Sequence, residues 1–380
     1  MRTVLFVGAL VCLLSGPAAG QQNSPQLEKV ADFQHQVTGV TVSEDGRIFV
    51  HFPRWTEDAQ VSVAEITTDG AIRPFPDPAW NTWRNASQGQ LSAHDRWVCV
   101  QSVVADGRGN LWVLDPAAPA TALVVPTGPK LVRINLATNQ VVQNIALHER
   151  AAPQGSYMND VRISPDGDYA YITDSGASGA LVVVDLRRET ARRVLDGHPT
   201  TQPEPGLAVK TDGEILRRPD GRGVQFAADG IAMSRDGRTL FWQALTGRIL
   251  YRVPTEALRN DKLSDAELAK QIEVEGINGV SDGLLIARDG RMYISALEEN
   301  AVKVRNGDRV TTVLQDERLR WPDTFSEGPD GAIYVTASRI MDSAWYKPDA
   351  KPQLPTSLWR FMPEGAGAAT GASSGSAPAR

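Results

Sequence analysis

The sequence predicts an all-β fold, a six-bladed β-propeller with four-stranded blades. Six times along the chain, a short apolar run leads into an Asp-Gly turn and then into a second run rich in β-branched and aromatic residues. Asp-Gly between two such runs indicates a hairpin, because the turn needs a positive φ that glycine adopts without strain. The turn glycines of the six copies are Gly46, Gly107, Gly167, Gly237, Gly290 and Gly331. They lie 61, 60, 70, 53 and 41 residues apart, and self-similarity at such a period is typical of propeller blades.

Further hairpins between these copies bring each unit to about four strands. The first strands of the units, 161–163 and 284–286 for example, are apolar at successive positions. Such runs suit strands buried on both faces, as expected where every blade packs between two others. One short helix is expected at 263–271, because Ser264 and Glu267 form a capping box at its start.

The ends of the repeat indicate how the ring closes. Only thirty residues separate Gly331 from Phe361, too few for a complete sixth unit. Residues 21–36 precede the first unit and belong to none. We therefore expect this N-terminal segment to pair with a C-terminal strand around 357–361, since an unclosed ring would leave two open sheet edges.

The two ends of the chain differ in composition from the repeat. Residues 1–20 have a basic start, an apolar stretch at 4–14 and small residues before position 21, which is the pattern of a signal peptide. We expect export to the periplasm or the external medium. Residues 21–362 form the predicted propeller, and residues 363–380 form a small, polar, low-complexity tail that is expected to be disordered.

Composition argues against nucleic acid and membranes as partners. The 380 residues carry a formal net charge of −6, which argues against nucleic acid or an anionic membrane as the main partner. No run beyond the signal peptide is long and apolar enough for an integral membrane segment. Cys99 is the only cysteine after the signal peptide, so no disulfide forms within the expected monomer.

Several motifs of these units together resemble one family. They include Pro-Arg-Trp at 53–55, Leu-Trp-Val-Leu-Asp at 111–115 and Trp-Pro-Asp at 321–323. With the surrounding segments, in order over nearly the whole mature chain, they look like the yellow and major royal jelly protein family. That resemblance implies a six-bladed propeller, and it implies activities as diverse as dopachrome conversion, binding of biogenic amines and nutrient storage. The lone Cys99 departs from insect members, which commonly carry disulfides, and makes the chain more similar to a bacterial branch.

A more distant resemblance is to gluconolactonase-like metal hydrolases. It implies a channel metal, Ca²⁺ or another divalent cation, held by Asn159, Asp229 and Asp282. The first unit lacks the acidic residue that such enzymes place there.

The candidate site comes from alignment of the six units on their first strands. One residue of each unit then falls into register just before that strand, and these form the predicted channel ring: Thr38, Gln101, Asn159, Asp229, Asp282 and Asp323. Three carboxylates confined at a channel mouth raise one another's pKa, so they call for a cation, a proton or a polar ligand. All six side chains offer oxygen, the ligand type of Ca²⁺ and Mg²⁺. Alternatively, an Asp before Gly only bonds the backbone of its own turn.

Aromatic residues lie close to the ring positions in the sequence. Tyr157, Phe226 and Phe325 lie within three residues of ring members, as does Trp321. Acidic groups with aromatic walls suit an organic ammonium, through charge pairing and cation–π contact. The alternative is that these rings fill space between blades.

Three classes of function remain open from the sequence. The first is an exported yellow-type protein that binds a small cationic or aromatic molecule at the channel mouth and isomerises it if it is an enzyme. There Asp229 or Asp282 would be the general base of a tautomerisation, with Asn159 and Gln101 orienting a carbonyl or hydroxyl. The second is a metal-dependent lactone hydrolase, whose cation activates water or polarises a carbonyl. The third is a non-catalytic interaction or structural propeller with an inert channel.

Overall fold

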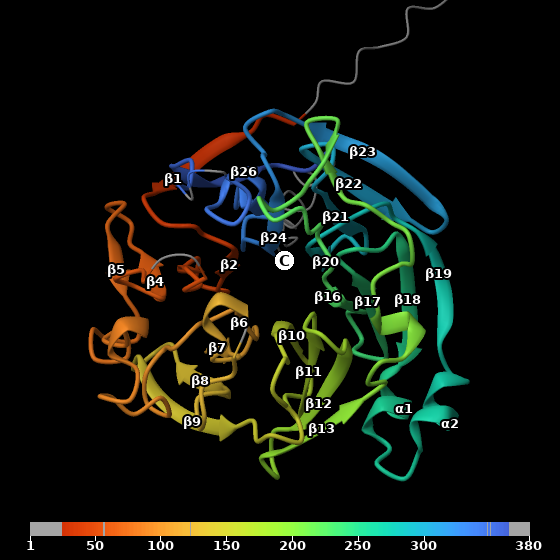
Figure 1. The fold of residues 1–380 in the computed structure, drawn as a ribbon, viewed down its shortest axis with the longest axis horizontal. Helices are drawn as coiled ribbons and strands as arrows, with labels where there is room; N and C mark the ends of the chain where they lie inside the picture. The colour runs from red at the N-terminus through yellow and green to blue at the C-terminus, as the bar shows by residue number, and fades with distance from the viewer. Residues whose placement is uncertain (1–24, 56–57, 122, 348, 350, 365–380) are drawn as a thin grey trace, which may run out of the picture.

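The protein is a ring of six blades around a central channel (Figure 1). The computed structural model describes residues 25–55, 58–121, 123–347, 349 and 351–364. Within these residues the chain forms six four-stranded sheets, and the ribbon shows them arranged side by side around one centre. The predicted six-bladed β-propeller is therefore confirmed. The predicted signal peptide and nearly all of the predicted tail lie outside the described residues.

The first three blades follow one another along the chain, each with its strands in sequence order from the channel outward. The first contains β2 (Gly39–Val42), β3 (Ile48–His51), β4 (Val63–Ile66) and β5 (Ile72–Pro74). The second contains β6 (Ser102–Ala105), β7 (Asn110–Asp115), β8 (Lys130–Asn135) and β9 (Gln140–Ala146). The third contains β10 (Met158–Ile163), β11 (Tyr169–Asp174), β12 (Ala180–Asp185) and β13 (Thr190–Val194).

The last three blades repeat this order until the ring closes. The fourth contains β16 (Ala228–Met233), β17 (Thr239–Ala244), β18 (Ile249–Pro254) and β19 (Glu273–Ile277). The fifth contains β20 (Leu284–Ile286), β21 (Met292–Ala296), β22 (Ala301–Asn306) and β23 (Arg309–Gln315). The sixth contains β24 (Pro322–Glu327), β25 (Ile333–Ala337), β26 (Thr356–Phe361) and, outermost, β1 (Glu28–Phe33). All six turn glycines named above have the positive φ that the Asp-Gly hairpins predict.

The two ends of the described chain close the ring. Strand β1 pairs antiparallel with β26, from Glu28 opposite Arg360 to Phe33 opposite Thr356. The expected pairing of the N-terminal segment with the C-terminal strand is thus confirmed, and it covers the edge of β26 that would otherwise stay open.

The connection between the third and fourth blades contains the main insertion. It carries a two-stranded hairpin, β14 (Lys210–Thr211) and β15 (Glu214–Ile215), which explains the longest spacing in the repeat. The predicted short helix is confirmed as α2 (Asp265–Ala269), with both hydrogen bonds of the Ser264–Glu267 capping box present. A second short helix, α1 (Thr255–Arg259), was not expected from the sequence. Single 3₁₀ turns form at Asn85–Ser87, Pro119–Thr121, Pro199–Thr201 and Ile340–Asp342.

The hydrophobic core is divided among the contacts between neighbouring blades. Phe49 and Val103 share one cluster between the first and second blades, and Tyr171 and Trp242 share another between the third and fourth. Such burial of both faces of each sheet is the main stabilising term of the fold. Cys99 is buried and free, and among the described helices none is long and apolar enough to cross a membrane.

Candidate functional site

Five of the six predicted ring residues line one pocket at an end of the channel. We call it the ring pocket, and its lining includes Gln101, Asn159, Asp229, Asp282 and Asp323. The sixth, Thr38, is buried nearby but is not part of this lining, and its hydroxyl lies 2.8 Å from Nε2 of His51.

Bulges in the innermost strands place these side chains at the channel. The pairing register shifts between Met158 and Val161, between Ala228 and Ile231, and between Pro322 and Phe325, with Asn159, Asp229 and Asp323 inside these shifts. A bulge adds one residue to a strand and redirects its side chains. The same distortion therefore recurs in three blades at the ring position.

Close approach of the innermost strands explains the glycines that follow two of the aspartates. A Cβ on Gly230 would lie 2.4 Å from the carbonyl oxygen of Asp282, and a Cβ on Gly283 would lie 2.0 Å from that of Asp323. Both distances are too short for a side chain, so only glycine allows the strands to come this close. These Asp-Gly pairs therefore serve contact between blades rather than a turn.

The three aspartates form a buried carboxyl cluster with strongly perturbed protonation. Asp229 and Asp282 are hydrogen-bonded to each other, and Oδ2 of Asp282 accepts a hydrogen bond from Nε1 of Trp321 at 2.6 Å. Burial raises the pKa of all three carboxyl groups, and the charge of neighbouring carboxylates raises those of Asp229 and Asp323 further. The pKa of Asp282 rises to about 7. Near neutral pH, protons are therefore shared within the cluster.

A fourth carboxyl group and one cation lie behind the ring. Asp160 follows Asn159 within the same bulge, is buried, and has a raised pKa because of its burial. A terminal nitrogen of Arg162 lies 3.7 Å from Oδ2 of Asp160 and also donates to the carbonyl of Leu284 across the channel at 2.8 Å. Sequence reasoning missed Asp160 because a regular strand would turn it away from the face of its neighbour, whereas in the bulge it is close enough for its charge to raise the pKa of all three ring aspartates.

A hydrogen-bonded chain fixes the two amides of the ring. The Tyr157 hydroxyl donates to Oε1 of Gln101 at 2.6 Å, Nε2 of Gln101 donates to Oδ1 of Asn159 at 2.9 Å, and Nδ2 of Asn159 donates to Oγ of Ser175 at 3.1 Å. Burial raises the pKa of Tyr157, so its hydroxyl stays protonated. Both amides are therefore held in one orientation.

Aromatic side chains form much of the remaining wall. Trp55, Tyr157, Phe226, Trp321 and Trp345 line the ring pocket, and Trp55 stacks on Trp345 with ring centres 4.9 Å apart. Trp55 and Trp345 were not candidates from the sequence, because they belong to connecting loops with no fixed position in the repeat. Phe325, a sequence candidate, packs in the core cluster of the fifth and sixth blades and is not part of the pocket lining.

Trp321 has an unusual backbone conformation. Its φ is 53°, in the left-handed region, although it is a bulky residue that is only 1% exposed. Such a conformation costs on the order of 1–3 kcal/mol and persists only where the surroundings enforce it. In this conformation the indole N–H of Trp321 donates a hydrogen bond to Asp282.

The ring pocket is small and adjoins a larger chamber. The ring pocket holds about 20 Å³, which is about the room that one water-sized group needs. The adjoining chamber, which we call the vestibule, holds about 690 Å³ and shares Thr121, Tyr157, Ser175 and Phe226 with the ring pocket. A compact polar group fits the ring pocket, and a larger body fits the vestibule.

Buried aspartates at the ends of second strands position the loops that carry ring residues. Oδ2 and Oδ1 of Asp115 accept from the backbone N–H groups of Val98 and Cys99 at 2.7 and 3.0 Å, and Asp174 accepts from that of Tyr157 at 2.8 Å. The Leu-Trp-Val-Leu-Asp motif thus has a structural role, because its last residue fixes the segment just before Gln101.

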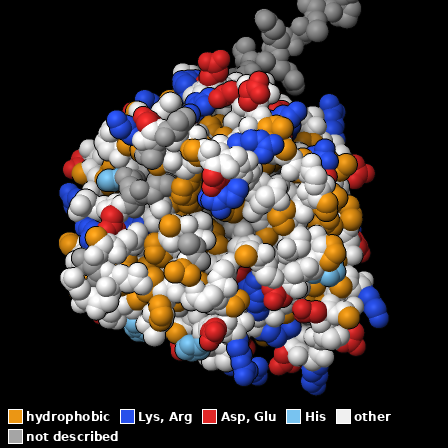
Figure 2. All heavy atoms as spheres, in the orientation of Figure 1, with side chains coloured by type: hydrophobic (Ala, Val, Ile, Leu, Met, Phe, Trp, Pro, Cys, Tyr) orange, Lys and Arg blue, Asp and Glu red, His pale blue; other side chains and the backbone are white. Residues whose placement is uncertain are grey.

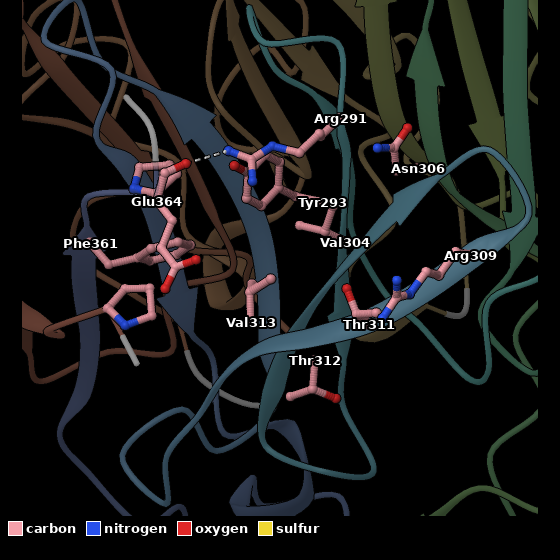
Figure 3. A pocket seen from close by; sticks show the side chains of 12 residues that line it. Arg291, Tyr293, Val304, Asn306, Arg309, Thr311, Thr312, Val313, Phe361 and Glu364 are labelled. Carbon is pink, nitrogen blue, oxygen red and sulfur yellow. Dashed lines mark hydrogen bonds between the residues drawn. The ribbon is translucent and has the colours of Figure 1, made fainter. Parts of the chain in front are cut away.

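Another pocket lies at the outer rim of the propeller. It holds about 460 Å³ between the fifth blade and the end of β26 (Figure 3). There Arg291 donates to the carbonyl of Glu364 at 3.3 Å and pairs with Asp289 at 2.6 Å. Its lining contains no ring residue, so we do not take it as the candidate site.

The residues named by the gluconolactonase resemblance fit a metal poorly. Oδ1 of Asn159 already accepts from Gln101, and Asp229 and Asp282 bond each other. Among the described residues, no group of three His, Cys, Asp or Glu side chains is arranged to hold a metal ion. We therefore derive no step through a metal.

Fold and site together define the class of protein: a closed six-bladed propeller with a buried carboxyl cluster at one end of its channel. Within that class, residues 98–346 match the family model of the major royal jelly proteins, more than half of the chain. The chain belongs to the major royal jelly protein family.

Curated relatives are distant in sequence. Protein yellow of Drosophila erecta is 22% identical over 278 residues, covering 67% of this chain and 48% of that protein. Major royal jelly protein 3 of Apis mellifera is 21% identical over 280 residues, covering 72% of this chain and 47% of that protein. The chain spans about half the length of the curated relatives it matches.

Solved structures of similar fold are enzymes and binding proteins by name. A gluconolactonase from Xanthomonas campestris has a TM-score of 0.54 at 13% identity, covering 89% of each chain. A luciferin-regenerating enzyme has a TM-score of 0.54 at 10% identity, covering 90% of this chain and 96% of that one. The calcium-binding protein regucalcin from Agrobacterium tumefaciens has a TM-score of 0.51 at 14% identity, covering 89% of this chain and 95% of that one. At these identities the similarity shows the fold alone.

Proposed function

We propose that this protein binds a small organic cation with an aromatic body at the carboxyl end of its channel. The observation that carries the proposal is the convergence of three buried carboxyl groups and five aromatic side chains on one pocket. Export through residues 1–20 and a monomeric state belong to the same proposal.

The charge balance of the channel supports a cationic ligand. Asp160, Asp229, Asp282 and Asp323 are all buried, and among the described residues the one ion pair that any of them forms is that of Asp160 with Arg162. Buried carboxylates without enough counter-charge take up protons or a cation. An ammonium group supplies that charge and donates hydrogen bonds to carboxylate oxygens.

Size and wall chemistry support an aromatic body on that cation. The ring pocket admits a group the size of water, which matches an ammonium and excludes an aromatic ring. The vestibule has room for the ring, beside Tyr157 and Phe226. Cation–π contact with the aromatic walls adds about 0.5–2 kcal/mol.

The same carboxyl pair is suited to proton transfer on the bound molecule. A general acid or base works best with a pKa near the working pH, and the pKa of Asp282 is raised to about 7. We propose that Asp229 and Asp282 take a proton from one position of the ligand and return it at another, so that the ligand is isomerised without net change. Gln101 and Asn159 would orient its carbonyl or hydroxyl.

The test is calorimetric titration with dopamine and serotonin. Asp229→Asn combined with Asp282→Asn is expected to weaken binding at least tenfold, because the neutral amides cannot pair with an ammonium. The matched control is Asp236→Asn, which changes an exposed aspartate in the turn at the other end of the same strand as Asp229.

Two results would count against the proposal. Unchanged affinity in the double variant would show that the carboxyl cluster does not hold the ligand. About one equivalent of calcium in the purified protein, lost in the double variant, would instead support the metal-dependent lactone hydrolase.

A further inference from the structure

The vestibule carries charge opposite to that of the ring pocket. Arg218 and Arg222 line it, and no Asp or Glu among the described residues does. The ring pocket has three Asp and no Lys or Arg in its described lining. The two chambers share four wall residues, so a ligand that spans them meets a negative end and a positive end.

Arg218 is the cation of the vestibule that is available to a ligand. Within the described part of the chain it forms no ion pair with a carboxylate, whereas the exposed Arg222 pairs with Asp220 at 2.6 Å. The guanidinium carbon of Arg218 lies 5.0 Å from the ring centre of Trp345, which stacks on Trp55. Arg218 is therefore held against the aromatic wall of the ring pocket with its hydrogen-bond donors free of carboxylate partners.

The segment that carries Arg218 is anchored across the channel mouth. We call residues 202–226 the arm; it contains β14 and β15 and is the light-green loop in front of the fifth and sixth blades (Figure 1). Asp212 of the arm pairs with Arg320 at 2.8 Å, and the backbone N–H of Lys210 donates to Glu298 at 2.7 Å. Figure 2 shows Lys and Arg side chains close to the middle of the same face. The arm thus places a cation over the mouth and holds it there.

We propose that the ligand is an aromatic zwitterion, such as an aromatic amino acid, with its ammonium in the ring pocket and its carboxylate on Arg218. This inference rests on the proposed function and narrows its ligand class. A guanidinium matches a carboxylate with two parallel hydrogen bonds. A simple amine supplies no counter-ion for Arg218, whereas the carboxylate of a zwitterion does.

Matched pairs of ligands test the proposal, because tyrosine and tyramine, or 5-hydroxytryptophan and serotonin, differ only by the carboxylate. In calorimetry, the wild-type protein should bind each amino acid at least tenfold more tightly than its amine. In Arg218→Gln the ratio of the two affinities should fall to about one. Arg217→Gln is the matched control, because it removes the same charge from the neighbouring exposed residue, which does not line the vestibule.

The outcomes separate this inference from the function on which it rests. If amines bind and amino acids bind no more tightly, the inference is overturned and the proposed function stands. The same holds if Arg218→Gln, shown by thermal denaturation to be folded, weakens both members of a pair equally. If the wild-type protein binds neither member, both the inference and the proposed function are overturned.

Discussion

Asp282 is the residue of the carboxyl cluster whose pKa is raised to about 7. It bonds Asp229 on one side and Trp321 on the other, and besides its burial the negative charge of Asp160 raises its pKa. Arg162, the nearby cation, is paired with Asp160. Since the folded state raises the pKa of Asp282 from 3.8 to about 7, folding favours its protonated form. The stability that results is present below about pH 4 and is lost as the pH rises through 7.

We predict that the single substitution Asp282→Asn changes the pH dependence of the free energy of unfolding. Between about pH 4 and pH 7, the wild-type protein should lose about 1 kcal/mol per pH unit relative to the variant, because asparagine cannot titrate. Urea denaturation at several pH values measures this difference. A constant difference across the range would mean that Asp282 is not a buried acid of raised pKa.

Among the elements, the innermost strands decide how closely the carboxyl groups meet. β20 lies against β24 where Gly283 approaches the carbonyl of Asp323, and β16 lies against Asp282 in the same way through Gly230. The bulges then direct side chains from these strands into the pocket. The carboxyl cluster is thus a result of how the strands pack. The packing of the blades behind these strands offsets the free-energy cost of burying the carboxyl groups.

We predict that Gly283→Ala destabilises the protein by about 2 kcal/mol or more. Its Cβ would lie 2.0 Å from a backbone oxygen, so β20 and β24 must move apart, and forced repacking of this kind costs about 1–3 kcal/mol. Gly223→Ala is the control, because its Cβ would meet its nearest atom at 4.0 Å. Chemical denaturation compares the two, and equal stability of both variants would contradict the close approach.

For the whole molecule, the pairing of β1 with β26 makes the ring continuous. Asp32 and Ser357 face each other in this pair, with the Ser357 hydroxyl donating to Oδ1 of Asp32 at 2.7 Å. Nearly the whole propeller lies between these two positions in the sequence. A covalent link there would restrict the unfolded chain over a very long loop.

We predict that Asp32→Cys with Ser357→Cys forms a stabilising disulfide. The oxidised form should exceed the reduced form in free energy of unfolding by about 4 kcal/mol, because the closed loop is long. Cys99 should not compete, since it is buried and its pKa is raised to about 12. Denaturation with and without a reductant measures the gain, and no difference would mean that the ends separate before the blades unfold.

Sequence reasoning predicted the fold well because each repeat unit contains a turn motif that can be recognised from a few neighbouring residues. Each Asp-Gly hairpin marks an inner strand pair, so the number of blades and their closure followed, and both are confirmed. The arm was visible only as a long spacing, since its hairpin has no counterpart in the other units. Helix α1 has no capping box like that of α2, so no signal marked its start.

The candidate site was predicted less completely because its geometry depends on departures from regular strands. Register along the repeat named six positions, of which five line the ring pocket. Asp160 was missed because of the bulge beside it, and Trp345 because it lies in a loop. Phe325 lies two residues after Asp323 and would share its face in a regular strand, but the register shift between Pro322 and Phe325 breaks that alternation and Phe325 packs between blades.

The pairing of the first strand with the last also determines when the ring can close during synthesis. Strand β1 leaves the ribosome before the other strands of the propeller and β26 after them, so a growing chain can build early blades but has no partner for β1. Asp323, which completes the carboxyl cluster, lies in the sixth blade as well. A chain still being synthesised therefore has neither a closed ring nor a complete carboxyl cluster, and under the function proposed above it would bind its ligand only after the whole propeller has emerged.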